Sequence, residues 1–203
     1  MLGVAGAMAV RDVYPELSPV VDVVFPIDAR RYLPTATAQQ TVQLLIASLT
    51  FAIDLRTDQG LIARSQAITS TLRDFIANEG PLRVLRLLNQ FRFKQMLPRV
   101  KYPNCVIASS LGQLSLPASP SGVRVVECGW LANGGIHLPA FMQTSATIDG
   151  RFAVTSYSTW IAPHRLRALA ERTDFRLREF AGLANSTSAL PESAHRLSAT
   201  SPA

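Results

Sequence analysis

The chain has 203 residues, 48% of them hydrophobic and 17% charged, which excludes an intrinsically disordered protein and suits one domain or one half of a larger protein. Its net charge of +6 fits either a solvated surface or attraction to anionic partners. Two cysteines make no disulfide framework or zinc motif, and the apolar runs are too short to cross a bilayer, so we expect a cytoplasmic protein with at most peripheral membrane contact.

The N-terminal third is expected to contain one helix and at least one strand. Residues 1–10 have helical apolar spacing without an N-cap, which fits either the end of a helix in a larger fold or an ordinary N-terminal helix. Residues 20–26 form a β-branched run typical of a buried strand, and residues 28–34 follow as a polar loop. Residues 41–53 are β-rich but also fit a buried helix, so their type is left open.

Two helices are predicted in the middle of the chain. The first is capped by Thr57 or Asp58 and ends at Gly80 in a left-handed conformation, and its apolar face holds Leu61, Ile68, Leu72, Phe75 and Ile76. The second opens at Pro81 and continues to about Met96 with basic outer faces. Such a helix either packs on a core with a soluble outer face, or docks on a membrane or an acidic protein.

The second half of the chain changes to β-rich segments. Strands are predicted at 104–109, 123–127, 141–148 and 151–159, and the last two flank the dipeptide Asp149-Gly150, a strong hairpin signal.

A helical pattern then closes the ordered part of the chain. A helix is expected from Pro163, and Asp174 is placed to cap a last one. Residues 183–203 lack periodicity and are predicted to be a disordered tail, which leaves 1–182 as the folded unit.

Four segments in order resemble the C-terminal half of the condensation-domain superfamily. They are Phe25–Pro34 with its D-x-R, Asn104–Gly112 with Ser110 in place of the family Asn, Val125–Trp130 with a matching Gly-Trp, and Thr147–Thr155 with a D-G-R turn. This superfamily includes chloramphenicol acetyltransferase-like enzymes, peptide-synthetase condensation domains and the polyketide-associated acyltransferases of mycobacterial lipid assembly. The chain looks most similar to the last group.

The resemblance implies an α/β half of chloramphenicol acetyltransferase-like topology, with a mixed β-sheet flanked by helices. Two such halves enclose a tunnel, and a His-x-x-x-Asp motif in the N-terminal half supplies the catalytic base. This chain contains no such motif and therefore no residue that we assign as catalytic. The positions four residues after its three histidines, His137, His164 and His195, hold Phe141, Ala168 and Ala199.

The second wall of the tunnel is what the resemblance carries over to this chain. Arg30 matches the D-x-R arginine that ties the two halves together, with Asp28 as its partner. Ser109, Ser110 and Gly112 are candidates for the tunnel wall or for oxyanion donors. The alternative for the two serines is that their hydroxyls form hydrogen bonds with the backbone at the strand end. Gly129 and Trp130 are expected to form a structural packing corner.

Two functions follow as hypotheses. One is the C-terminal portion of an acyltransferase that takes its acyl group from acyl-CoA or an acyl carrier protein and uses no metal or other cofactor. Its partner would be a missing N-terminal half, or a second copy bound through an exposed apolar face. The other is a non-catalytic interaction module or relic that keeps only the binding wall. Nucleic acid is not an expected partner, because aromatic residues do not interleave with the basic ones.

Overall fold

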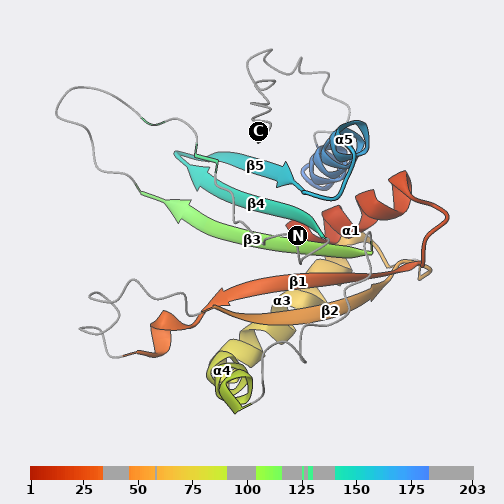
Figure 1. The fold of residues 1–203 in the computed structure, drawn as a ribbon. Helices are drawn as coiled ribbons and strands as arrows, with labels where there is room; N and C mark the ends of the chain where they lie inside the picture. Colours follow the sequence, from red (N-terminus) through yellow and green to blue (C-terminus); the bar gives the residue numbers. More distant parts are fainter. Residues whose placement is uncertain are drawn as a thin grey trace, which may run out of the picture.

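A five-stranded mixed sheet with helices packed on it forms the centre of the computed structural model (Figure 1). The strand order is β2-β1-β3-β4-β5. The structure describes residues 1–33, 46–57, 59–90, 104–115, 125, 128–129 and 140–182.

The first two strands pair along their whole length. Strand β1 (Val20–Asp28) runs antiparallel to β2 (Ile46–Asp54), and Val20 lies opposite Asp54. The ambiguous segment 41–53 is thus a strand over the part that the structure describes. Ala47 and Ile53 are buried while Ser48 and Thr50 are exposed, which is the period-two alternation of a half-buried strand.

The remaining strands confirm the predicted hairpin, and one of them is longer than predicted. Strand β3 (Cys105–Leu114) extends five residues beyond the expected 104–109 and runs parallel to both β1 and β4 (Phe141–Ile148). Strand β5 (Arg151–Tyr157) returns antiparallel to β4. Asp149 and Gly150 between them have φ values of 48° and 77°, as a type I′ turn requires. Most of the strand predicted at 123–127 lies outside the described residues.

Helices α1 (Leu2–Val13), α3 (Leu61–Ala77) and α4 (Gly80–Gln90) confirm three predicted helices but correct their ends. Gly60, not Thr57, is the N-cap of α3, and Asp58 lies outside the described residues. Glu79, not Gly80, takes the left-handed conformation, with a φ of 53°. Gly80 is needed for space instead, because a Cβ there would lie 2.3 Å from the Phe75 ring.

Two further local predictions are wrong in detail. The polar loop after β1 contains a 3-10 turn, η1 (Ala29–Tyr32), because the Asp28 carboxylate accepts a hydrogen bond from the Arg30 backbone N–H. The expected cap at Asp174 is instead inside one continuous helix, α5 (Pro163–Phe180). The Asp174 carboxylate accepts a hydrogen bond from Arg178 one turn later, at 2.7 Å, and so supports the helix.

The core lies between the sheet and α1, which packs across β1, β3 and β4 and alongside α5 (Figure 1). Two glycines let α1 approach closely. A Cβ on Gly3 would lie 2.6 Å from Val23 Cγ1, and one on Gly6 would lie 2.3 Å from Gln143 Oε1. Both neighbours belong to the sheet, so the small-residue face of α1 sets the distance between helix and sheet.

One buried polar pair crosses this core. Gln143 on β4 donates from Nε2 to Thr173 Oγ1 on α5 at 2.9 Å, and that hydroxyl donates to the Leu169 carbonyl at 2.8 Å. Both side chains are at most 1% exposed. Gln143 Oε1, against Gly6, has no hydrogen-bond partner among the described residues. An orphaned buried acceptor of this kind costs stability.

This arrangement predicts different effects on stability for two substitutions. Gln143→Met keeps the shape but removes both the orphaned oxygen and the donor, so the free energy of unfolding should stay unchanged or rise by about 1 kcal/mol. Thr173→Val removes the acceptor and leaves the Gln143 amide unpaired, so it should lower that free energy by about 1–3 kcal/mol. Urea denaturation of both variants measures the difference. Equal losses in the two would contradict this account of the pair.

Candidate functional site

Strands β1 and β3 pair only briefly and then separate. Their ladder joins Asp22–Val24 to Cys105–Ile107, and it begins with the Asp22 N–H donating to the Asn104 carbonyl at 2.8 Å. Because backbone N–H groups alternate in direction along a strand, position 26 would donate toward β3 as well. Position 26 is proline, which has no N–H, so the ladder ends there. Beyond this point β1 diverges from β3 (Figure 1).

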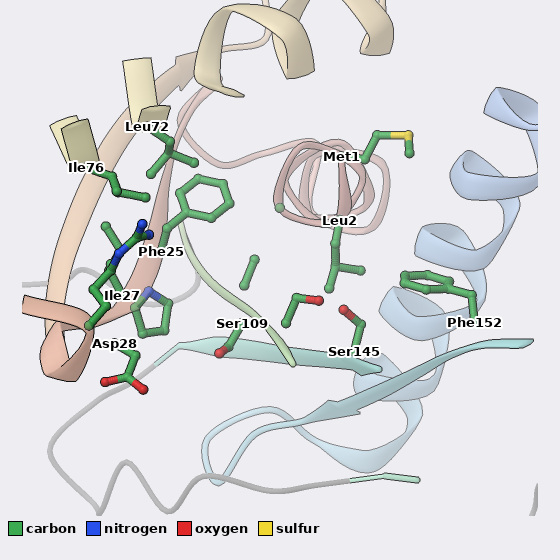
Figure 2. A pocket seen from close by; sticks show the side chains of 15 residues that line it. Met1, Leu2, Phe25, Ile27, Asp28, Leu72, Ile76, Ser109, Ser145 and Phe152 are labelled. Atoms are coloured by element: carbon green, nitrogen blue, oxygen red, sulfur yellow. The ribbon is translucent and has the colours of Figure 1, made fainter. Parts of the chain in front are cut away.

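A pocket of about 740 Å³ lies where the two strands separate (Figure 2). It is lined by the end of β1, Arg31 of η1, the middle of β3, one residue each of β4 and β5, the start of α1, and one side of α3. Its apolar side chains include Leu2, Phe25, Ile27, Leu72, Ile76 and Phe152.

Three serines are among the residues that line the pocket, and two of them are on the same face of the sheet. Ser110 on β3 and Ser145 on β4 are register partners, and both are on the α1 face of the sheet, the face of Ala108 below Gly3. Ser109 belongs to the opposite face by strand alternation, and Figure 2 shows its hydroxyl turned away while Ser145 points toward the start of α1. Ser110 and Ser145 are therefore the serines whose side chains are on the α1 face of the sheet.

Ser110 sits at a β-bulge. The register of β3 against β4 shifts between Ser110 and Gln113, and Gly112 within the shift has a φ of 71°. The Ser110 hydroxyl accepts a hydrogen bond from the Gly112 N–H at 3.1 Å. This is the hydrogen bond to the backbone that the sequence analysis gave as the alternative to a functional role. A hydroxyl that accepts one hydrogen bond still has its own proton to donate. Ser110 thus keeps a donor for a ligand, whereas the Gly112 N–H is already used.

Asp28 and Arg30 pair with each other beside the pocket. Arg30 Nε lies 2.9 Å and 3.0 Å from the two Asp28 oxygens, and an Arg30 Nη lies 2.6 Å from Oδ2. The hydrogen bonds from Arg30 hold the pKa of Asp28 below its ordinary value. The expected partnership therefore exists, and its role in joining two halves stays a prediction.

Other singled-out residues lie apart from the pocket. A Cβ on Gly129 would lie 2.9 Å from Thr155 Oγ1, and Thr155 pairs with Thr144, on the sheet face opposite Gln143 and α1. Gly129 therefore packs on the far face of the sheet. Trp130, His137 and His195 lie outside the described residues.

Ordinary catalytic chemistry has few candidates in the described part of the chain. His164 is exposed at the start of α5, away from the pocket lining. Burial raises the pKa of Cys105 to about 12, so its thiol is a poor nucleophile. No cluster of three or more histidine, cysteine, aspartate or glutamate side chains suitable for a metal occurs in the described ranges.

The residue that sequence reasoning missed is Ser145. A signal was present, because polar Gln143 and Ser145 alternate on one face of a strand that is buried along most of its length. From the sequence, Leu72 and Ile76 were predicted only to lie on the apolar face of a helix. In the structure, both residues line the pocket.

Comparison with solved structures identifies the fold. The epimerization domain from the third module of tyrocidine synthetase B matches 90% of this chain with a TM-score of 0.53 and 17% sequence identity. Polyketide synthase associated protein 5 from Mycobacterium tuberculosis matches 86% with a TM-score of 0.54 and 15% identity. The chain has a chloramphenicol acetyltransferase-like half fold. It spans only 40% and 45% of the length of those two proteins, which confirms the predicted half-domain resemblance.

Sequence comparison adds no further relationship. No family model and no curated protein sequence matches this chain. Among the described helices, none is long and apolar enough to cross a membrane.

Proposed function

We propose that this chain is the C-terminal portion of an acyltransferase that moves an acyl group from a CoA or carrier-protein thioester to a hydroxyl or amine acceptor in lipid or polyketide assembly. The observation that carries the proposal is the match of nearly the whole chain to about two fifths of two condensation-type proteins. Since the chain has no His-x-x-x-Asp motif, a second half, in the same protein or in a partner, supplies the base.

The chemistry is ordinary acyl transfer. The imidazole of the second half takes the proton of the acceptor O–H or N–H as the acceptor attacks the thioester carbonyl. A tetrahedral oxyanion forms, and its collapse breaks the carbon–sulfur bond. The leaving thiolate then takes the proton from the imidazolium, so no oxidant, reductant or metal is consumed.

In this proposal the half described here binds the substrate and stabilises charge. Ser110 and Ser145 lie side by side in register at the pocket and supply O–H donors for the oxyanion. The Asp28–Arg30 pair stands beside the pocket at the end of β1, where a second half would contact it. Arginine paired in this bidentate way is suited to a fixed structural contact.

The test is an acyl-transfer assay with medium- and long-chain acyl-CoA. The chain is assayed alone and in a purified one-to-one complex with the N-terminal half of a related condensation-fold protein. We expect no activity alone and transfer by the complex. Transfer by the chain alone would contradict the need for a second half. A one-to-one complex without transfer would contradict the enzymatic proposal and favour the interaction module or relic.

A further inference from the structure

We propose that a second pocket, at the other end of α1 from the pocket of the candidate site, binds a small oxyanion of the phosphate class. It has a volume of about 240 Å³, and we call it the arginine pocket because Arg11 of α1 and Arg64 of α3 both line it. Its other walls are the last turns of α1 and Leu55, Thr57 and Gln59 after β2. The proposal goes beyond the proposed function and does not depend on it.

The arginine pocket is separate from the larger pocket. Strands β1 and β2 are antiparallel, so the end of β1, which lines the larger pocket, and the segment after β2 lie at opposite ends of the sheet (Figure 1). Along α1, residues 1–3 line the larger pocket and residues 8, 11 and 12 line the arginine pocket. The middles of these two groups are about 12 Å apart along the helix axis. No described residue lines both pockets.

The positive charge of Arg64 is buried without a carboxylate beside it. Arg64 is only 7% exposed. Its guanidinium donates to the backbone carbonyl oxygens of Gln59, Asp54 and Thr57 at 2.7, 2.5 and 2.6 Å. Among the described residues no carboxylate pairs with it, because the Asp54 carboxylate is bound by Arg56 at 2.6 Å. Arg64 therefore holds the loop after β2 in place but still lacks a counterion, which a buried charge normally has.

Arg11 adds a second guanidinium that has no carboxylate partner. Its Nη1 donates to the carbonyl oxygens of Pro15 and Leu17, the latter at 3.2 Å. Its Nε and Nη2 form no hydrogen bond with any described residue, so their N–H groups are available to a ligand. Planar guanidinium groups with free N–H donors match the oxygens of a phosphate group.

The surroundings of the two arginines also favour an anion. Asp12 is the one carboxylate among the described lining residues, and it is already bound by Arg176 at 2.9 Å and 3.1 Å. Helix α3 begins at Gly60, next to the lining residue Gln59, with no side-chain cap and no acidic residue in its first turn. The positive end of its dipole is therefore uncompensated there.

The size of the arginine pocket limits the ligand to one ionised group. Pockets that hold a whole small molecule have volumes of roughly 300–1,000 Å³. The arginine pocket, at about 240 Å³, is smaller than these. It fits inorganic phosphate or the phosphate group of an ester whose remaining part lies outside the pocket.

The experiment titrates inorganic phosphate into the purified full chain by calorimetry at neutral pH, with the ionic strength held constant by sodium chloride. We expect saturable one-to-one binding with a Kd of about 1 mM or tighter. Glycerol phosphate, a small phosphate monoester, is titrated in parallel. An ester that binds at least as tightly as inorganic phosphate identifies the phosphate group of a larger molecule as the ligand, and weaker binding of the ester identifies the free ion. Absence of saturable binding by both would overturn the proposal.

Two matched substitutions locate the site. Gln59→Glu keeps the size of an exposed side chain and places a carboxylate at the arginine pocket, so the Kd for phosphate should weaken by about tenfold or more. Gln113→Glu makes the same charge change at an exposed position near the end of β3, at the other end of the sheet, and should change Kd less than about twofold. Equal weakening in the two variants would show that phosphate responds only to the net charge of the chain, and would overturn the proposal.

The stability of Gln59→Glu separates loss of binding from loss of the fold. An acidic residue beside the first turn of α3 interacts favourably with the helix dipole, so the Tm measured without phosphate should not fall. The Tm of the original protein should rise with phosphate concentration at constant ionic strength, because the ion binds the folded state. That rise should be lost in Gln59→Glu and kept in Gln113→Glu. A rise of the same size in all three proteins would overturn the proposal.

Discussion

Replacing Ser110 and Ser145 together with alanine is expected to lower kcat of the completed acyltransferase by at least about a hundredfold. Loss of one preorganised oxyanion donor commonly costs 10²–10³ in kcat, and both hydroxyls lie on the same face in adjacent register positions. Because the hydrogen bonds strengthen only as charge develops, KM should change little. Steady-state kinetics of the complex with a second half measure both constants.

The control for this experiment is Ser48→Ala. Ser48 is an exposed serine on β2, outside the pocket, so its loss should leave kcat within about twofold. The single variants assign the two hydroxyls separately, since the Ser110 hydroxyl already accepts the Gly112 N–H and acts only through its own proton. If the double variant kept kcat within twofold of the original, the serines would not be the oxyanion donors.

Gly6→Val is expected to destabilise the fold by about 3 kcal/mol or more, one of the largest effects of any single change in α1. A Cβ at this position lies 2.3 Å from Gln143 Oε1 and 3.0 Å from Val106 Cγ1, and both neighbours are fully buried. Gln143 is held by Thr173, so it cannot turn aside without breaking a buried hydrogen bond. Overpacking of this kind costs about 1–3 kcal/mol and a broken buried hydrogen bond about 1–3 kcal/mol more, while the β-branched side chain gains little in helix propensity over glycine.

Urea denaturation of Gly6→Val tests the close approach of α1 to the sheet. Gly60→Ala is its control, because nothing lies within 4 Å of a Cβ there, and it should change the free energy of unfolding by less than about 1 kcal/mol. A Gly6→Val protein as stable as the original would mean that α1 packs farther from β3 and β4 than described.

Local chemistry made part of this fold predictable. The Asp149-Gly150 turn could be predicted from the sequence because few dipeptides accept two positive φ values. The strands on either side of the turn could then be placed from it. The helix ends were harder. Gly80 serves close packing against Phe75 rather than a left-handed φ, and that distinction depends on a neighbour that sequence spacing does not reveal.

The pocket shows where sequence reasoning stops for a physical reason. The sequence shows that position 26 is a proline and therefore has no N–H to donate. Only the strand register shows that an N–H at this position would point toward β3, which explains why the two strands separate there. Ser110 was selected from its segment, whereas Ser145 became a candidate only when the parallel register set it beside Ser110. Likewise, only the folded structure shows that Leu72 and Ile76 line the pocket.

The most direct test of the central claim is a crystal structure of the completed protein, with both halves present and a non-hydrolysable thioester analogue bound. We predict that the analogue's acyl chain lies among Phe25, Ile27 and Leu72, with its carbonyl oxygen within hydrogen-bond distance of Ser110 or Ser145. The imidazole of the second half should approach that carbonyl from the other side. A carbonyl bound away from both serines, with the pocket unoccupied, would contradict the account of this chain as the substrate-binding half of an acyltransferase.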